Sequence, residues 1–472
     1  MPRRRISARR QWSACTGALV LAAAAAAGCT SPLPDLTDPA NRAEGSQTIV
    51  WVSSPTLRNA SDDARQVLVD AFEQAYPSIK VNLQPGPDNT DRLHEKLSGE
   101  LSGGSATPDV YSGDVTWPAE FGHDGLALPL NDYFPASFWS QFAPPGTALA
   151  DNTLIQAMSY RGNVYAVPYF VDYGFLFYRK DLLAQAHLPA PSTWEQLLAD
   201  ARALKNRGLP YQFAWQGDAY EGLTCDWTEL LADAYGGQSA AQFATSAGQA
   251  TAARLASPQA LKALDFLRTL IGDGLSPAGV NGFEEPQGDS AFDSGQAAFL
   301  RSWDSSWANA VSATSAVADL DKVGVMPLPT FQGQRGPGSS VVGGWNLFVN
   351  PHSRNLTADL TFVRWMAGPQ AQRILATQFS EIPSNYAVRT SSDVTANTPI
   401  MAAAARISPV SRPSSTPDYG ELSKKIYSGI HEALPAGPGL PAADPCTTLL
   451  KAARAIDPAV HSTLPCDVTG GG

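Results

Sequence analysis

Segments with a strand pattern alternate with segments with a helix pattern along the first part of this 472-residue chain. Apolar stretches at residues 47–52, 77–83 and 108–112 predict three strands. Residues 62–76 and 91–101 predict the helices between them, because apolar side chains recur there at helical spacing. Strands that alternate with helices form a mostly parallel, wound sheet with helices on both faces. The alternation therefore predicts an α/β fold.

The same pattern resumes later in the chain. Residues 165–168 and 173–178 predict further strands, and Thr193 predicts a helix start ahead of Trp194. From Ala358 onward the pattern is mainly helical. A chain of this length exceeds one ordinary hydrophobic core, which favours two lobes.

The N-terminus has the composition of an export signal. Arginines at 3–5 and 9–10 precede a short apolar run that ends at Gly28. That run falls short of the roughly 20 apolar residues of a membrane-spanning helix. The sequence thus predicts a signal peptide over residues 1–28 and a protein that works outside the cytoplasm. Residues 29–46 are polar and rich in proline, which predicts a flexible tether.

Cys29 follows the small residues directly and resembles the lipidated cysteine of bacterial lipoproteins. The resemblance implies acylation of Cys29 and anchoring to the cell membrane, with Ala26 standing where leucine is usual. A plain cleaved signal with an incidental cysteine is the alternative. The arginine pair at 9–10 loosely resembles a twin-arginine export signal, and the sequence leaves the export route open.

Composition removes several classes of function. The formal net charge of −11 becomes about −16 once the five signal arginines are removed. No run of lysine or arginine follows the signal, which argues against nucleic acid and against charge-driven binding to an anionic membrane. The chain has no CxxC or HExxH motif, and its six histidines are scattered, so the sequence supports neither a metal nor a cofactor.

Three cysteines remain beyond the signal and Cys29. Cys446 and Cys466 are close in the sequence, and an oxidising compartment favours pairing, so we expect one disulfide between them. Cys225 is then expected to be a buried free thiol, although pairings through it stay open.

Short motifs follow one another in order along nearly the whole mature chain. They lie at residues 108–110, 114, 117–121, 125–130, 165–169, 176–181, 191–195, 292–299, 303, 324–329 and 343–347. Together they resemble the sugar-binding group of the extracellular solute-binding proteins (family 1) that serve ATP-driven importers. Asp114, residues 120–121 and 220–223, and Arg412-Pro413 most resemble trehalose- and maltose-type binders, including actinobacterial lipoproteins.

The resemblance implies a periplasmic-binding-protein-like fold, in which two α/β lobes joined by a hinge enclose a ligand cleft. Residues 47–165 and 316–370 are expected to form lobe 1, and residues 166–315 and 371–472 lobe 2. Open α/β sheets bind ligands beyond their strand ends, which fits such a cleft. The family is not enzymatic, so the resemblance implies a protein that uses no cofactor. It also implies a monomer that passes a small sugar to permease subunits in the membrane.

The resemblance also implies the ligand-binding residues. Sugar hydroxyls donate to carboxylates, arginine donates in a fixed fork, and aromatic rings stack on the C–H face of a sugar. The candidates are Asp114, Asp172, Glu221, Trp303, Gly344, Trp345 and Arg412, with Arg92 and Tyr169 as further candidates. We expect Asp114 and Asp172 to lie just after strands. We also expect the two glycines before Trp345 to let a ligand approach the backbone closely. The alternative roles are solvation or helix capping for the charged candidates and core packing for the tryptophans.

An α-linked disaccharide is the expected ligand, because no basic cluster that would bind a phosphate accompanies these positions. Another sugar and a glycerophosphodiester remain alternative ligands. A secreted glycoside hydrolase would also need paired carboxylates among aromatic residues. A purely structural surface lipoprotein would need no such cleft.

Overall fold

The computed structural model describes residues 47–465 except 55–58, 60–61, 206, 209–211, 238–247, 278 and 397. The predicted signal peptide and tether, together with Cys29 and Cys466, lie outside the described residues. Within the described residues, no helix combines the length and apolar character that a membrane crossing requires.

The larger of the two main sheets has the strand order β12-β6-β11-β3-β1-β2. Its strands are β1 (Gln47–Ser53), β2 (Ile79–Pro85), β3 (Val110–Asp114), β6 (Val167–Tyr173), β11 (Ser339–Val349) and β12 (Ile382–Pro383), and β13 (Ser408–Val410) pairs with the start of β11. β1 is parallel to β2 and β3, as the strand–helix alternation predicts. β11 lies antiparallel between β3 and β6.

Helices cover this sheet because their apolar faces pack on it. They are α1 (Ala64–Ala75), α2 (Thr90–Ser102), α3 (Pro118–His123), α14 (Leu356–Met366) and α15 (Pro369–Phe379). Phe362 of α14 makes edge contacts with Trp51 of β1 and Phe72 of α1, at centroid distances of 5.2 and 5.0 Å. The predicted apolar stripe after Ala358 is thus part of this core.

The smaller sheet has the strand order β10-β7-β9-β8. Its strands are β7 (Phe175–Arg179), β8 (Phe213–Ala214), β9 (Phe299–Ser302) and β10 (Val323–Pro327). The helices that accompany it are α6 (Lys180–Ala186), α7 (Trp194–Leu204), α8 (Glu221–Ala234), α10 (Gln249–Leu255), α11 (Pro258–Gly272), α12 (Glu285–Asp293), α13 (Ser306–Ala310), α18 (Pro399–Ala404), α19 (Tyr419–Ala433) and α20 (Pro445–Ile456). Shorter elements are α4 (Ala136–Trp139), α5 (Thr153–Ala157), β4 (Ser159–Tyr160), β5 (Asn163–Val164), α16 (Tyr386–Arg389) and α17 (Ser392–Thr395).

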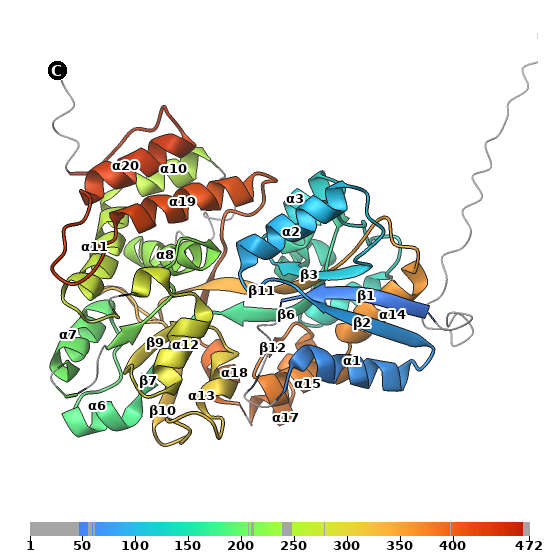
Figure 1. Cartoon of the computed structure of the whole chain (residues 1–472), viewed down its shortest axis with the longest axis horizontal. Helices are drawn as coiled ribbons and strands as arrows, with labels where there is room; N and C mark the ends of the chain where they lie inside the picture. The colour runs from blue at the N-terminus through green and yellow to red at the C-terminus, as the bar shows by residue number, and fades with distance from the viewer. Residues whose placement is uncertain are drawn as a thin grey trace, which may run out of the picture. The chain divides into compact units, whose positions relative to one another are not determined.

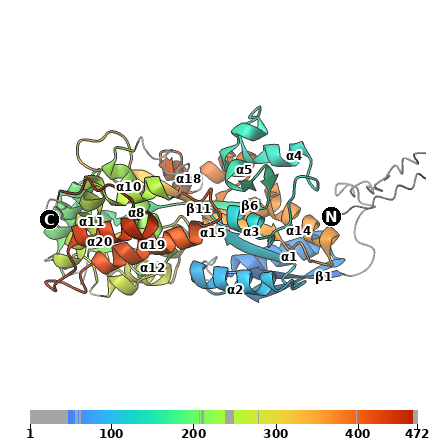
Figure 2. The same cartoon turned by 90° about the horizontal axis from the view of Figure 1, so that it is seen from above.

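Each main sheet has its own hydrophobic core, and we call the two parts the larger-sheet lobe and the smaller-sheet lobe. One core contains Ile49 and Trp51 with the helices of the larger sheet. Two further clusters surround the smaller sheet, with Leu176 in one and Phe177 in the other. Figure 1 shows the helices grouped around the two sheets, and Figure 2 shows the same grouping after a quarter turn. Separate cores identify two structural units.

The chain crosses between the lobes where β6 ends and β7 begins, with Gly174 as the single residue between them. A Cβ at Gly174 would collide with the side chains of Glu229 and Arg301, so only glycine fits here. The hydroxyl of Ser340 on β11 donates to the carbonyl oxygen of Gly174 over 2.7 Å. The crossing is therefore packed tightly against α8, β9 and β11.

Several local predictions are confirmed. The predicted helix start is correct, because the Thr193 hydroxyl oxygen accepts from the Gln196 N–H over 3.1 Å. The predicted strand at 173–178 corresponds to β7, and the strand predicted at 165–168 continues to Tyr173 as β6. Cys225 is free and buried, as expected. Cys446 is disulfide-bonded, and its pairing with Cys466 stays a prediction.

The expected lobe boundaries are wrong at two places. β10 falls in the segment expected in lobe 1, but it pairs with β7 and so completes the smaller sheet. Ala371, Leu375 and Phe379 of α15 were expected in lobe 2, but they pack in the core of the larger-sheet lobe. Both differences arise because the chain crosses between the lobes again within β11 and after α15, at points that periodicity does not mark.

Candidate functional site

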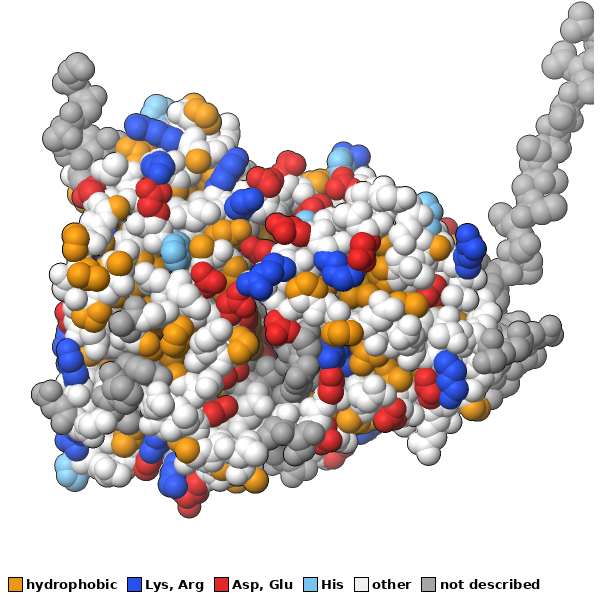
Figure 3. All heavy atoms as spheres, in the orientation of Figure 1, with side chains coloured by type: hydrophobic (Ala, Val, Ile, Leu, Met, Phe, Trp, Pro, Cys, Tyr) orange, Lys and Arg blue, Asp and Glu red, His pale blue; other side chains and the backbone are white. Residues whose placement is uncertain are grey.

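A cavity of about 830 Å³ lies between the two lobes. Its wall takes residues from β3, β6 and β11 of the larger sheet and from α8, α12 and α13 of the smaller-sheet lobe. In Figure 3, acidic and basic side chains gather around the hollow in the middle of the face shown. A cavity of this size, set where two sheets meet, suits a small-molecule ligand.

Arg412 joins two carboxylates that come from different lobes. Its Nη2 donates to Oδ1 of Asp114 on β3 over 3.2 Å, and its Nη1 donates to Oε1 of Glu221 on α8 over 2.5 Å. Only 2% of Arg412 is exposed. Burial alone would lower the pKa of Arg412, but the charges of its neighbours, Asp114 foremost, raise it well above the ordinary value. Arg412 is thus a fixed positive charge at the cavity, and we call these three residues the Arg412 group.

Neighbouring hydroxyls fix both carboxylates of the Arg412 group. Oδ1 of Asp114 accepts from the backbone N–H and the hydroxyl of Thr116 at 2.8 and 2.7 Å. Glu221 accepts from the hydroxyls of Tyr419 and Ser423, both at 2.5 Å. Because both oxygens of Glu221 are occupied, this side chain supports Arg412 and is not the solvated loop residue that its sequence position suggests.

Two tryptophans bring flat apolar surface to the cavity wall. Trp345 on β11 is paired in register with Asp114 and meets Trp117 edge-on, with ring centroids 6.3 Å apart. Trp303 follows β9, and the guanidinium carbon of Arg301 lies 4.2 Å from its ring centroid. Both tryptophans are half-buried and line the cavity, whereas Trp307 belongs to the core. Such rings can stack on the C–H face of a sugar.

The glycines before Trp345 serve the packing of the protein itself. Gly344 has a φ of +117°, and a Cβ there would collide with the carbonyl oxygen of Phe170 on β6. A Cβ at Gly343 would lie 2.9 Å from the ring of Trp303. Gly344 lines the cavity, but the close approach that requires glycine is to β6 and not to a ligand, which corrects the sequence-based interpretation.

Asp172, Asp304 and Glu381 form a second group, which we call the carboxyl triad. One carboxylate oxygen of each lies within 4.8 Å of the others, and all three residues are buried. The backbone N–H of Ile382 donates to Oδ2 of Asp304 over 2.8 Å. Burial raises the pKa of Asp172 to about 6, even though hydrogen bonds with the other two carboxyls oppose the shift. Burial, followed by the charge of nearby Asp172, raises the pKa values of Asp304 and Glu381 well above their ordinary values.

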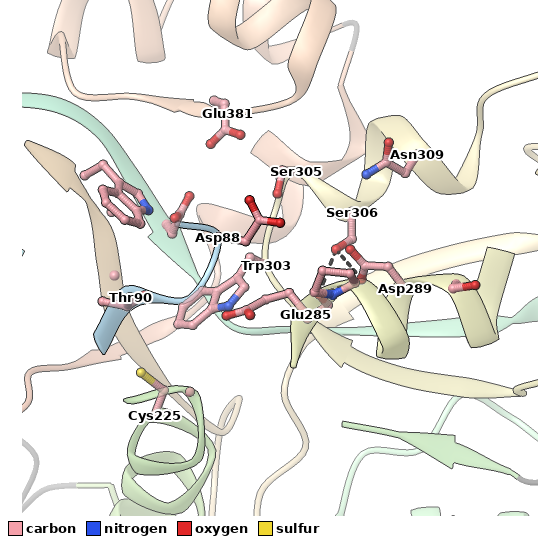
Figure 4. Close-up of a pocket in the computed structure, with 18 of the residues that line it drawn as sticks. Asp88, Thr90, Cys225, Glu285, Asp289, Trp303, Ser305, Ser306, Asn309 and Glu381 are labelled. Atoms are coloured by element: carbon pink, nitrogen blue, oxygen red, sulfur yellow. Dashed lines mark hydrogen bonds between the residues drawn. The ribbon is translucent and has the colours of Figure 1, made fainter. Parts of the chain in front are cut away.

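Helix α12 supplies a third acidic part of the wall. Glu285, Asp289 and Asp293 are spaced four residues apart, so they share one face of the helix, and all three line the cavity. The hydroxyls of Ser302 and Ser306 each donate to Oδ1 of Asp289 over 2.8 Å, and Figure 4 shows Ser306 beside Asp289. Burial raises the pKa of Asp289 to about 6 and that of Asp293 to about 8.

Direct polar contacts join the lobes at the rim of the cavity, and we call them the rim contacts. Oε1 of Glu284, the residue before α12, accepts from Asn89 Nδ2 over 2.7 Å and from Arg92 Nη2 over 3.3 Å. Burial raises the pKa of Asp91 on α2, while hydrogen bonds from the Tyr427 hydroxyl and the Glu221 N–H oppose the shift. The N-terminal end of α2 therefore touches α8, α12 and α19.

The structure brings seven of the nine predicted ligand-binding residues to the cavity. They are Asp114, Asp172, Glu221, Trp303, Gly344, Trp345 and Arg412. Arg92 lies outside the wall, at the rim, with its side chain largely exposed. Tyr169 is buried in the core of the larger-sheet lobe, because side chains alternate along β6 and Phe170 and Asp172 take the cavity side. A role for Tyr169 in ligand contact is therefore wrong.

Two sets of acidic residues at the cavity were missed by the sequence reasoning. The four-residue spacing of Glu285, Asp289 and Asp293 is visible in the sequence and could have indicated an acidic helix face. Asp304 and Glu381 carry no such signal, because the triad forms only when β6, the residue after Trp303 and the segment before β12 meet.

Comparisons with known proteins agree with this architecture. A family model described as bacterial extracellular solute-binding protein matches residues 58–373. A probable ABC transporter-binding protein of Deinococcus radiodurans is 29% identical over 75% of this chain and 81% of the relative. A mannitol-binding protein of Pseudomonas aeruginosa is 26% identical over 82% of this chain and 84% of the relative.

A solved structure, maltose-bound MalE3 of T. maritima, matches 87% of this chain and 100% of its own chain. The TM-score is 0.74 and the sequence identity is 28%. The family and the fold are those of solute-binding proteins and not of enzymes, so the glycoside hydrolase alternative finds no support.

Proposed function

This chain belongs to the bacterial extracellular solute-binding proteins, and we propose that it is the saccharide-binding component of an ABC importer that takes an α-linked disaccharide. The observation that carries the proposal is the wall of the cavity, where two half-buried tryptophans lie beside a buttressed carboxylate. The relatives named for maltose and mannitol support a ligand rich in hydroxyl groups.

The chemistry of the wall suits such a ligand. Trp303 and Trp345 offer rings to the apolar face of a sugar, and Asp114 offers a carboxylate to its hydroxyls. Since Arg412 and Thr116 already hold Asp114 in place, a sugar that binds there pays little to order this side chain. Preorganised polar groups beside aromatic surface are what a neutral polyhydroxyl ligand needs.

The charge of the wall argues against a phosphate-bearing ligand. Eight carboxyl side chains line the cavity: Asp88, Asp114, Asp172, Glu221, Glu285, Asp289, Asp293 and Glu381. Within the described part of the chain, Arg412 is the single basic residue of this wall, and its ion pairs occupy it. An anion would find no further basic side chain on the described wall, which disfavours a glycerophosphodiester.

Delivery to a permease follows from the position of the cavity between two lobes. A ligand that contacts Asp114 of one lobe and Trp303 of the other favours the closed arrangement, which the rim contacts also support. We propose that permease subunits bind this closed form. Acylation at Cys29, with residues 30–46 as a tether, would keep the protein at the outer face of the cell membrane.

Calorimetric titration of the purified protein tests the proposal. The titrants are trehalose, maltose, mannitol and glycerophosphocholine, and the products are analysed after incubation. We expect reversible binding of a disaccharide, no hydrolysis and no binding of the phosphodiester. Asp114→Ala should weaken binding about tenfold or more, since it removes a charge-assisted hydrogen bond, whereas Asp70→Ala, which removes an exposed carboxylate of α1, should not. Hydrolysis of the sugar, or binding only of the phosphodiester, would overturn the proposal.

A further inference from the structure

We propose that the saccharide carries a protonated amine, and that this ammonium group binds among the three carboxyls of Asp172, Asp304 and Glu381. The inference rests on the proposed function and assigns a chemical class to the ligand of the same cavity. It departs from the neutral disaccharide that the sequence favours, because the structure shows a group of buried carboxyls that a neutral sugar leaves without a counter-charge.

The carboxyl triad opens to the cavity. Asp172 on β6 and Glu381 before β12 line the wall, and Asp304 lies behind them without solvent exposure. In Figure 4, the carboxyl group of Glu381 points toward the middle of the site. Two of the three side chains therefore border the space that a ligand would occupy.

Each carboxyl of the triad has an oxygen without a hydrogen-bond donor. These buried oxygens are Asp172 Oδ1, Asp304 Oδ1 and Glu381 Oε2, and outside the triad itself the described residues offer them no donor. In the same part of the chain, no lysine or arginine forms an ion pair with the triad, and Arg412 is engaged by Asp114 and Glu221. A buried oxygen that accepts no hydrogen bond costs free energy, so these three oxygens indicate a site for a ligand that carries a donor group.

The geometry of the triad matches an ammonium group. Because the three oxygens lie within 4.8 Å of one another, one nitrogen atom can be placed about 2.8 Å from all three, which is the usual N–H···O distance to a charged donor. An ammonium has three N–H donors, one for each carboxyl, whereas a sugar hydroxyl donates a single hydrogen. A calcium ion takes six to eight oxygen ligands, whereas the triad brings one oxygen from each carboxyl to the common point.

The remainder of the wall favours the same charge. Glu285, Asp289 and Asp293 of α12 add carboxyls to the cavity, and Arg412 is the one cation of the described wall. A cavity lined by one sign of charge concentrates ligands of the opposite sign. A cationic saccharide thus finds acceptors in the triad and further carboxyls on α12.

The test compares sugars that differ in one group. Calorimetric titrations of the full chain use trehalose and maltose, their monoamino derivatives with the amine at each ring position in turn, and the N-acetylated amines as neutral controls. We expect at least one amino sugar to bind about tenfold or more tightly than its parent, and N-acetylation to remove the gain. Parent sugars that bind as tightly as every amino derivative would overturn this inference and leave the proposed function intact; absence of binding by every compound would overturn both.

Two variants locate the ammonium group. Asp304→Asn keeps an oxygen that can accept from the Ile382 N–H, and Glu381→Gln keeps the size of the side chain. Either variant should bring the ratio between amino-sugar and parent-sugar affinity close to one, with a cooperative thermal transition retained. An unchanged ratio in both folded variants would overturn the assignment. A rise in melting temperature with calcium or sodium chloride alone, in the absence of sugar, would assign the triad to an inorganic cation and overturn it as well.

Discussion

The Arg412 group and the carboxyl triad are two buried polar groups at one cavity, and they differ in charge compensation. In the Arg412 group, two carboxylates share a guanidinium that is 2% exposed. In the triad, three carboxyls face one another, and the described residues give them no ion pair. The first arrangement balances its carboxylates with a buried guanidinium, whereas in the second the carboxyls have only one another as close charged neighbours among the described residues.

This difference teaches that nearby acidic residues need not have the same role. A compensated carboxylate such as Asp114 is held in place by its ion pair, so it suits the hydroxyl donors of a sugar. An uncompensated group changes its protonation with its surroundings, which is visible in the pKa of Asp172 that burial raises to about 6. Five predictions, ordered from the largest expected effect to the smallest, test the roles of these two groups and of the rim contacts.

Arg412→Ala breaks the compensated group. It leaves Asp114 and Glu221 buried without their counter-charge, so we expect the free energy of unfolding to fall by about 3–5 kcal/mol. Urea unfolding followed by circular dichroism measures the change. Arg92→Ala is the matched control, because this arginine is exposed and makes one weak contact at the rim, and it should cost less than about 1 kcal/mol. Equal effects of the two variants would show that Arg412 is not a structural charge.

Trp345→Ala separates ligand contact from folding beside the Arg412 group. Trp345 is paired in register with Asp114 and lies in the cavity wall, so we expect the affinity for the preferred saccharide to fall by about 2 kcal/mol or more. Calorimetry measures the affinity, and a thermal melt confirms the fold. Trp345→Phe keeps an aromatic ring and should retain part of the affinity. Unchanged binding heats in folded Trp345→Ala would exclude the ring from the ligand site.

The pH dependence of stability tests the uncompensated group. The pKa of Asp172 is about 6 in the folded protein, above its usual value near 4, because burial, with a smaller contribution from the charge of Asp114, outweighs the hydrogen bonds with Asp304 and Glu381 and the charge of Arg412. The folded state therefore holds its proton more tightly, and the ligand-free protein should lose stability as the pH rises from about 4 to 6 and beyond. Thermal melts across that range measure the loss.

Asp304→Asn sharpens this pH test. It removes one carboxyl of the triad and keeps an acceptor for the Ile382 N–H, so the decline with pH should flatten and stability at pH 7.5 should rise by about 1–2 kcal/mol. Asp70→Asn, on the exposed face of α1, is the control and should leave the profile unchanged. A profile that rises with pH in the unaltered protein would contradict the assignment.

Glu284→Ala tests how much the rim contacts add to the closed arrangement. The variant removes the acceptor of Asn89 and Arg92, and we expect a change of about 1 kcal/mol or less in favour of the open form. Solution scattering should show a larger radius of gyration without ligand and contraction at saturating sugar. Glu432→Ala removes an ion pair between α19 and α20 within one lobe and should not alter the radius. A radius insensitive to saturating sugar would exclude closure.

Much of the fold was predictable, because it depends on local patterns. The alternation of strands and helices in residues 47–112, the Thr193 cap and the apolar stripe of α14 are confirmed, since each depends on spacing within about a dozen residues. The lobe boundaries near β10 and α15 were wrong, because the chain changes lobes there and periodicity does not report which core a segment joins.

The candidate site, like the fold, was only partly predictable from the sequence. The chain by itself determined the α/β alternation, the family resemblance and the residue types at the cavity, and seven of nine candidates line it. Only the tertiary structure decided that Tyr169 faces the core, that Glu221 supports Arg412, and that Asp172 meets Asp304 and Glu381 without a cation. The physical reason is that the role of a charged side chain depends on burial and on the distance to other charges. In this protein those charges come from segments far apart in the sequence, and folding alone brings them together.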